Sequence, residues 1–296
     1  MKYFSAFSGI GGFDLAINRI IPNAICVGYS EVDKYAIKVY EKRFPNRICF
    51  GDITRIDTKT LPDFDVFFGG FPCQDISLAG KRAGLYGSRS GLFFEIIRII
   101  REKQPSIILL ENVKGLLSSN GGWDFARVLI ELDECGYDVE WQCLNSKNFG
   151  VPQNRERLFI IGHLRGKPWE RIFPIKEIRN TNSKRVKGES NTFLKLKKIF
   201  NIYGHGQCGI VYDIRGISPT ICCTGERLIS INNKIRKLTP LESERLQGYP
   251  DNWTECISKT ERYKCIGNAV TVNVIELIIK KIYEYSPNSK TDYRQI

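Results

Sequence analysis

Short β-rich runs alternate with helical patterns over the first 163 residues, and this alternation constrains the fold more than any other feature of the chain. Strands are predicted at 3–7, 24–29, 47–50, 66–68, 107–110, 137–144 and 157–163, and helices at 12–20, 34–44, 92–102 and 123–135. A chain that repeats strand and helix in this way forms a mostly parallel sheet with helices on both faces. The sequence therefore predicts an α/β fold.

The pattern changes at about residue 165, where short polar and basic segments replace the regular repeat. This part is predicted to form a second, smaller and irregular domain. Regular structure returns at Thr239, which is predicted to cap a helix with Pro240 at its first position and Glu242 three residues after the cap. A final amphipathic helix is predicted over residues 270–283.

The chain carries a formal net charge of +12. Residues 164–200 hold eleven Lys or Arg and three Glu, so most of the excess lies there. A basic segment of this density is either a solvated face or the electrostatic footprint of a protein that binds phosphate backbones. Nucleic acid is therefore the leading predicted partner.

Several familiar features are missing from the sequence. No apolar run approaches the roughly 20 residues that a membrane-spanning helix needs, and no signal-length apolar stretch opens the chain. The ten cysteines include no Cys-x-x-Cys pair, and His163 and His205 offer little material for a metal cluster or a Ser-His-Asp relay. We expect a cytoplasmic protein with reduced thiols, no metal and no membrane partner.

Cys73 stands where the predicted strand 66–68 breaks into Gly-Gly-Phe-Pro-Cys-Gln at residues 69–74. Pro72 fixes its own backbone and pushes Phe71 toward extended geometry, so the cysteine is delivered at the carboxyl end of a strand. Ligands and catalytic groups collect at that edge of open α/β sheets. Cys73 is therefore either a nucleophile or a small apolar residue that fills a tight turn.

Three further strand ends carry groups that suit an adenosine-containing cofactor. The glycine-rich sequence at residues 7–13 opens the first helix, so backbone N–H groups and the helix dipole can face a polar cofactor edge. Glu31 ends the second strand, where a carboxylate accepts hydrogen bonds from ribose hydroxyls, and Asp52 and Ile53 end the third, beside an adenine. Each has a simpler alternative: a bare tight turn for the glycines, and a helix cap for each acid.

Glu111 follows the apolar run at 107–110, which places a carboxylate at the same predicted edge as Cys73. Arg155 and Arg157 enter a later strand, and their spacing of two places them on one face of it. A surface salt bridge explains one arginine. Two arginines beside a cysteine and a carboxylate indicate an electron-rich substrate.

Six ordered motifs of the chain resemble those of DNA (cytosine-5) methyltransferases of the bacterial and phage restriction-modification type. They are Phe-Ser-Gly-Ile-Gly-Gly-Phe at 7–13, Gly-Phe-Pro-Cys-Gln at 70–74, Glu-Asn-Val at 111–113, Gln-Asn-Arg-Glu-Arg at 153–157, Arg-Leu-Gln-Gly-Tyr-Pro at 245–250 and Gly-Asn-Ala-Val at 267–270. The resemblance implies a Rossmann-like methyltransferase sheet formed by residues 1–164 and 261–296. It also implies a target-recognition domain formed by residues 165–260, where the family carries its variable region.

The resemblance implies that S-adenosylmethionine is the cofactor and S-adenosylhomocysteine the product. The implied cofactor-binding residues are Phe7, Gly9, Gly11, Glu31, Asp52, Ile53, Leu92 and Asn268. Many relatives place a tryptophan against the adenine directly after the ribose acid, whereas this chain has Val32. One face of the adenine pocket is therefore expected to be less well stacked.

The implied reaction is methyl transfer to C5 of a cytosine that is flipped out of duplex DNA. Cys73 would add to C6 as a thiolate, and Glu111 would hydrogen-bond N3 and the exocyclic amine. Arg157 would contact the cytosine O2, and Arg155 would support the nucleophile and its loop. The implied DNA contacts are Gln74, Ser77, Arg89, Gln153, Arg215 and Thr220. A monomer is expected, acting either beside an independent restriction endonuclease or as an orphan or phage methylase.

Three other interpretations compete with this one. RNA (cytosine-5) methyltransferases of the tRNA-modifying branch share most catalytic motifs, but they usually show Pro-Pro-Cys and Cys-Phe-Thr, which this chain lacks. A non-catalytic DNA-binding relative predicts decay of the nucleophile or its partners, yet Cys73, Glu111 and Arg157 are all present. A nicotinamide oxidoreductase is disfavoured because Asp14 stands where Gly-x-Gly-x-x-Gly needs its last glycine.

Overall fold

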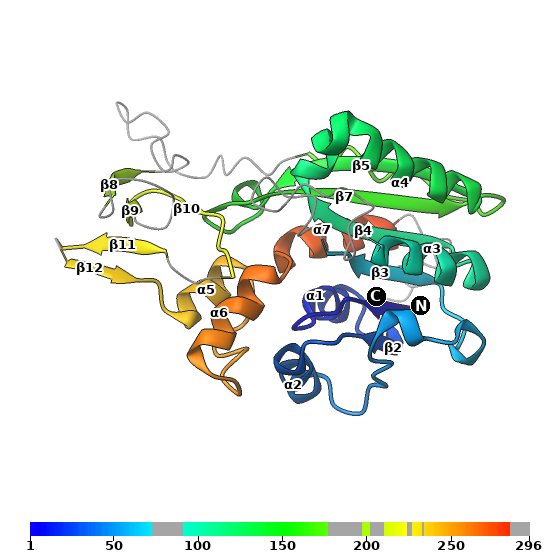
Figure 1. Cartoon of the computed structure of the whole chain (residues 1–296), viewed down its shortest axis with the longest axis horizontal. Coiled ribbons are helices and arrows are strands. Elements are labelled where there is room, and N and C mark those ends of the chain that lie inside the picture. Colours follow the sequence, from blue (N-terminus) through cyan, green and yellow to red (C-terminus); the bar gives the residue numbers. More distant parts are fainter. Residues whose placement is uncertain (73–90, 177–196, 202–209, 224–226, 233, 285–296) are drawn as a thin grey trace, which may run out of the picture.

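The computed structural model describes residues 1–72, 91–176, 197–201, 210–223, 227–232 and 234–284. Its centre is a six-stranded sheet with the order β2-β1-β3-β4-β7-β5 (Figure 1). The strands are β1 (Lys2–Ala6), β2 (Ile25–Ser30), β3 (Val66–Gly70), β4 (Ile107–Val113), β5 (Tyr137–Asn145) and β7 (Glu156–Leu164). The first four strands in the order run parallel, and β7 pairs antiparallel with both β4 and β5. The predicted mostly parallel α/β sheet is confirmed.

Helices cover both faces of this sheet. The helices of the large unit are α1 (Gly12–Ile20), α2 (Lys34–Arg43), α3 (Leu92–Lys103), α4 (Trp123–Glu134) and α7 (Val272–Glu284). One buried cluster joins Phe68 to residues of α1, α2 and α7, and a second joins Phe67 to residues of α3 and α4. Because successive side chains of a strand point to opposite faces, these two neighbouring phenylalanines serve the two halves of the core.

One predicted strand, at residues 47–50, is wrong. Cys49 forms only an isolated bridge with Tyr29, and Gly51 then turns the chain with a φ of 64°. Two backbone hydrogen bonds join Tyr29 to Ile48 and Phe50 at this bridge, and the Arg47 guanidinium donates to the fully buried Asp14 over 2.6 Å. A single pairing residue before a left-handed turn is too short to make a strand.

The smaller unit, which the sequence predicts to be irregular, contains a four-stranded sheet within its described residues. Its strands, in the order β12-β11-β9-β8, are β8 (Lys198–Asn201), β9 (Ile210–Asp213), β11 (Leu228–Ile231) and β12 (Lys234–Lys237). A two-stranded ladder of β6 (Gln153–Asn154) and β10 (Ser218–Pro219) connects the two units, which lie side by side in Figure 1. No helix within the described ranges is long and apolar enough to cross a bilayer.

Helices α5 (Pro240–Leu246) and α6 (Lys259–Asn268) return the chain to the large unit. Thr239 and Glu242 form the predicted capping box at the start of α5. Beyond it, Tyr249 and Trp253 belong to the same buried cluster as α1 and α7, and the Trp253 Nε1–H donates to the Ile10 carbonyl over 2.9 Å. These contacts favour placing this stretch with the large unit, and the predicted division at residue 260 stays a prediction.

The remaining described helices are short 3-10 turns, which connect the main elements. They are η1 (Ile53–Arg55), η2 (Thr58–Thr60), η4 (Lys114–Gly122) and η5 (Ser146–Asn148). Among them, η1 begins directly after Asp52. It lies at the carboxyl edge of the sheet, where ligands are expected.

Candidate active site at the carboxyl edge of the sheet

A cavity of about 470 Å³ opens at the carboxyl ends of β1, β2, β3 and β4. Most residues predicted to act on a cofactor or a base line this single space. They are Phe7, Gly9, Glu31, Asp52, Ile53, Leu92, Glu111, Arg155, Arg157 and Asn268. Residues from seven separate stretches of sequence thus meet at one edge of the sheet, as open α/β folds predict.

The glycine-rich turn forms the floor of the cavity. Gly9 and Gly11 have positive φ values of 55° and 81°, and Phe7 adopts a φ of 51°, which is uncommon for a residue with a side chain. A Cβ on Gly11 would lie 2.4 Å from Cε2 of Phe44, so this glycine is required by packing as well as by backbone conformation. Gly11 supports the turn but does not line the cavity.

Glu31 is fixed by three backbone N–H groups at the end of β2. Its Oε2 accepts from Gly9 over 2.8 Å, and its Oε1 accepts from Val32 over 2.8 Å and from Asp33 over 2.9 Å. The cap of α2 is Asp33, whose side chain accepts from Tyr35 and Ala36. Asp33 rather than Glu31 therefore caps α2, and Glu31 faces the cavity as a rigidly oriented carboxylate.

Asp52, which the sequence predicts either beside an adenine or as a helix cap, stands directly before η1. Its carboxylate caps η1 by accepting from the Thr54 N–H over 3.0 Å and from the Thr54 hydroxyl over 2.9 Å, and it also lines the cavity. The hydrogen bond from the Thr54 N–H, followed by that from its hydroxyl, lowers the pKa of Asp52. Asp52 is therefore an oriented anion beside Ile53.

Glu111 and Arg157 form an ion pair across the antiparallel ladder of β4 and β7. The Arg157 Nε lies 3.0 Å from Oε1 of Glu111, whose residue is only 9% exposed. This Oε1 is buried and accepts no hydrogen bond with good geometry from the described residues. A buried carboxylate oxygen in this state has capacity for a donor from a ligand in the cavity.

Arg155 is 2% exposed and joins the cavity to the smaller unit. Its guanidinium donates to the carbonyls of Ile221 and Gly267, both over 3.3 Å, and of Ala269 over 2.8 Å. A Cβ on Gly267 would lie 2.4 Å from the backbone of Cys222, so the end of α6 touches this segment directly. Arg155 therefore fixes the joint as well as one wall of the cavity.

Asn112 is a site residue to which the sequence interpretation gave no role. It is 1% exposed, its amide donates to the Phe71 carbonyl over 3.4 Å, and its Oδ1 accepts from the Val113 N–H over 2.8 Å. The sequence feature that could have indicated a role for Asn112 was its place inside the Glu-Asn-Val motif. Asn112 ties β4 to the backbone of Phe71, whose neighbour Pro72 lines the cavity. Cys73, Gln74, Ser77 and Arg89 lie outside the described residues.

The predicted DNA contacts that are described fall at two places, the joint between the units and the surface of the smaller unit. Gln153 is fully buried, donates to the Leu246 carbonyl over 2.9 Å and accepts from the Ile221 N–H over 2.9 Å. The Thr220 hydroxyl donates to the Asn154 carbonyl over 2.7 Å. Gln153 therefore stabilises the joint between the units, and its contact with DNA stays a prediction.

Arg215 lies at the surface of the smaller unit. Its side chain is 77% exposed, and its Nε and Nη2 donate to the carboxylate of Asp213. These hydrogen bonds lower the pKa of Asp213 to about 2. Arg215 is the one cation among the predicted DNA contacts that the structure describes, and its guanidinium faces solvent.

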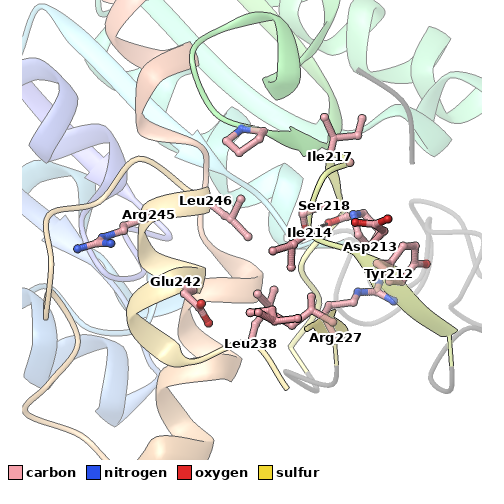
Figure 2. Close-up of a pocket in the computed structure, with 15 residues that line it drawn as sticks. Tyr212, Asp213, Ile214, Ile217, Ser218, Arg227, Leu238, Glu242, Arg245 and Leu246 are labelled. Atoms are coloured by element: carbon pink, nitrogen blue, oxygen red, sulfur yellow. Dashed lines mark hydrogen bonds between the residues drawn. The ribbon is translucent and has the colours of Figure 1, made fainter. Parts of the chain in front are cut away.

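A second cavity, of about 360 Å³, lies between the small sheet and α5 (Figure 2). Ile217, Leu238 and Leu246 line it, as does Arg245, whose guanidinium extends away from it. None of the residues predicted to bind cofactor or DNA is among its lining residues. The cavity at the carboxyl edge of the large sheet is therefore the candidate active site.

Comparisons with known structures agree with this architecture. The Dnmt2 methyltransferase of S. pombe superposes with a TM-score of 0.74 at 20% identity, covering 96% of this chain and 98% of that chain. The Entamoeba histolytica methyltransferase EhMeth gives a TM-score of 0.72 at 18% identity, with coverage of 96% and 98%. At such low identity the likeness shows the fold, which is the Rossmann-like methyltransferase sheet with a smaller second unit.

Sequence comparisons define the family. The model of the C-5 cytosine-specific DNA methylases matches residues 1–207 and 213–284. The chain is 34% identical to the type II methyltransferase M.HhaI of Haemophilus parahaemolyticus, covering 95% of this chain and 94% of the relative. It is 36% identical to the type II methyltransferase M.HpaII of Haemophilus parainfluenzae, covering 95% and 89%. The chain belongs to the C-5 cytosine-specific DNA methylases and is a DNA (cytosine-5) methyltransferase.

Proposed function

We propose that this enzyme methylates C5 of a cytosine flipped out of a specific duplex sequence, through a covalent bond between Cys73 and C6 of the base. The observation that carries the proposal is the shared cavity. It brings Glu111 and Arg157 together with the acids at the strand ends, and its wall extends to Pro72, the residue before Cys73.

The residues of the cavity fit S-adenosylmethionine, the methyl donor of the family. Glu31 is oriented to accept from ribose hydroxyls, and Asp52 and Ile53 suit the adenine amino group and ring face. The glycine-rich turn allows close approach of the backbone, and Leu92 and Asn268 complete the lining. When bound, this cofactor supplies an electrophilic methyl group.

Cytosine C5 is too weak a nucleophile to accept a methyl group directly, so the base must first be activated. Attack by the Cys73 thiolate forms a bond to C6 and moves electron density toward C5. An ordinary cysteine has a pKa of about 8.5, so the site must favour the thiolate. Loss of the C5 proton after methyl transfer, with departure of the thiolate, restores the aromatic base and the free enzyme.

The ion pair of Glu111 and Arg157 stabilises the base during this addition. The buried Oε1 of Glu111 can accept from the exocyclic amine or a protonated N3, and the Arg157 guanidinium can donate to O2. Because the two side chains lie on neighbouring strands, their separation is set before the base arrives. Arg155 holds the joint behind them.

Access to C6 requires the target base to leave the duplex, at a cost of a few kcal/mol. The net charge of +12 and the exposed basic strand β12 suit a polyanionic duplex as partner. We propose that Arg215 and Thr220 contribute to recognition from the smaller unit. The biological setting is then a modification enzyme beside an independent restriction endonuclease, or an orphan enzyme such as the relative M.SPRI of Bacillus phage SPR.

Incubation of the protein with labelled S-adenosylmethionine and either duplex DNA or tRNA tests the substrate class. We expect label at C5 of cytosine in DNA. Label only in tRNA would overturn the proposal. Bisulfite sequencing of a plasmid co-expressed with the protein would then reveal the target sequence, and methylation scattered over all cytosines would contradict sequence-specific recognition.

A further inference from the structure

Arg98, on the second turn of α3, contacts the loop that forms the acidic wall of the active-site cavity. Its Nη2 donates to the Ile53 carbonyl over 2.9 Å, and its Nη1 donates to the Ile56 carbonyl over 2.8 Å. Its Nε donates to the Glu95 carboxylate over 2.8 Å, one turn earlier on the same helix. The planar guanidinium is thus held by partners on three sides.

The two accepting carbonyls belong to Ile53, the first residue of η1, and to Ile56, the residue that follows the turn. The Ile53 carbonyl also accepts the Ile56 N–H over 3.4 Å, so Arg98 binds the backbone on both sides of the hydrogen bond that closes the turn. At the amino end of the same turn, Asp52 caps η1 and faces the cavity together with Ile53. Arg98 therefore holds the backbone of Ile53 itself as well as the residue that ends the turn.

The beginning of α3 contributes to the same cavity through Leu92. Ile53 and Ile56 share a buried apolar cluster with Phe93 and Ile97 of α3. Apolar contacts of this kind resist separation of the two elements but are not directional. The hydrogen bonds of Arg98 are directional. They therefore fix the orientation of η1 relative to α3, and with it the relative position of the two sides of the cavity that these elements form.

We infer that Arg98 is a positioning residue for the adenosine part of the cofactor, acting through the Asp52–Ile53 wall and held in place by Glu95. The inference rests on the proposed cofactor site. Arg98 does not line the cavity itself. Its effect reaches the ligand only through the backbone that it binds.

The test measures binding of S-adenosylhomocysteine to the full chain by titration calorimetry. We expect Arg98→Met to weaken binding about tenfold, which corresponds to about 1.4 kcal/mol. Arg98→Lys, which keeps one donor, should lose about threefold. The matched control is Arg101→Met on the same helix, because Arg101 is 58% exposed and its ion pair is with Glu131, away from the cavity. That control should bind as tightly as the wild type.

A double-mutant cycle separates positioning from general stabilisation. If Arg98 acts through the wall, Arg98→Met added to Asp52→Ala should cost much less than tenfold. Unchanged binding by Arg98→Met, or fully additive losses in the cycle, would overturn the inference, even if the melting temperature falls. Failure of the wild type to bind S-adenosylhomocysteine would instead refute the proposed cofactor site.

Discussion

The carboxyl edge of the large sheet and the surface of the small sheet hold their charged groups in opposite ways. At the edge, Glu31 accepts hydrogen bonds from three backbone N–H groups, and Arg155 donates hydrogen bonds to three backbone carbonyls. On the small sheet, β12 is exposed along its whole length, and Arg215 pairs with Asp213 only two residues away. One region fixes its groups through the fold, whereas the other displays them to solvent.

The two regions therefore differ in how much it costs to move or remove one charged group. A buried polar group that loses its partner costs about 1–3 kcal/mol, so groups at the edge cannot shift independently. Exposed ion pairs contribute about 0–1 kcal/mol and can exchange partners cheaply. Changes at the edge should therefore abolish or slow chemistry while DNA binding survives, and changes on the small sheet should do the reverse.

The largest effect is expected at Cys73. Cys73→Ala should abolish methyl transfer, because no other group in the proposed mechanism forms the bond to C6, while duplex DNA should still bind. Radiolabel transfer and gel-shift assays on the same preparation check both halves. Methyl transfer by the alanine variant would disprove the thiolate assignment.

Glu111→Gln should lower kcat by about a hundredfold, since the amide cannot accept with the strength of a buried carboxylate. Binding of S-adenosylhomocysteine should stay within twofold. The control is Glu156→Gln, because Glu156 is half exposed and pairs with the exposed Lys114. Equal losses in the two variants would show that the position of the charge in the cavity is unimportant.

Removal of two exposed cations on the small sheet should affect DNA rather than cofactor. Lys198→Gln combined with Lys234→Gln is expected to weaken duplex binding about tenfold and to reduce the slope against log salt by about 2. Lys280→Gln on α7 serves as the control, because Lys280 is also exposed but lies on the large unit. An unchanged salt slope would place the DNA on another face.

Val32 offers a gain rather than a loss. It is 70% exposed and lines the cavity beside Glu31, so Val32→Trp should add a stacking face for the adenine and tighten S-adenosylhomocysteine about fivefold. Val32→Leu should change the affinity less than twofold. Weaker binding by the tryptophan variant would mean that the ring blocks the pocket instead.

The smallest expected effect concerns Glu242. Hydrogen bonds from Arg236 lower its pKa from 4.5 to about 2. A depressed carboxyl pKa gives stability that is present above the unfolded value and is lost as the pH falls from about 4.5 toward 2. After allowance for solvent screening, Glu242→Gln should cost roughly 0.5 kcal/mol at pH 7 and almost nothing near pH 2. Urea unfolding at several pH values would reveal a pH-independent cost if this explanation is wrong.

The large sheet was predictable from sequence because its strands are long, apolar runs with helices of clear periodicity between them. Strands such as β12 were missed, since four exposed residues rich in Lys and Arg carry no burial pattern. The strand expected at residues 47–50 does not form, because the pairing is limited to one bridge before Gly51 turns the chain. The local apolar pattern does not reveal how far such pairing extends.

Site residues followed the same rule. Glu31 and Glu111 were found because each stands at the end of a predicted strand that the structure contains. Asp52 was found by the same argument, although the strand predicted before it does not form. Asn112 and Arg98 act through backbone carbonyls that are about 40 residues away in the chain, and only the folded structure brings those groups together. Motifs thus identified the groups that face the cavity better than those that hold them in place.

The packing of α7 beside α1 has a consequence for biosynthesis. The two helices share one buried cluster, and Arg19 of α1 binds Glu276 of α7 over 2.6 Å. At ribosomal rates of about 5–20 residues per second, α7 is made roughly 10 to 50 s after α1. During that interval the apolar face of α1 has no α7 to cover it, while the small sheet is already synthesised. Completion of the catalytic unit is therefore among the last events in making this enzyme.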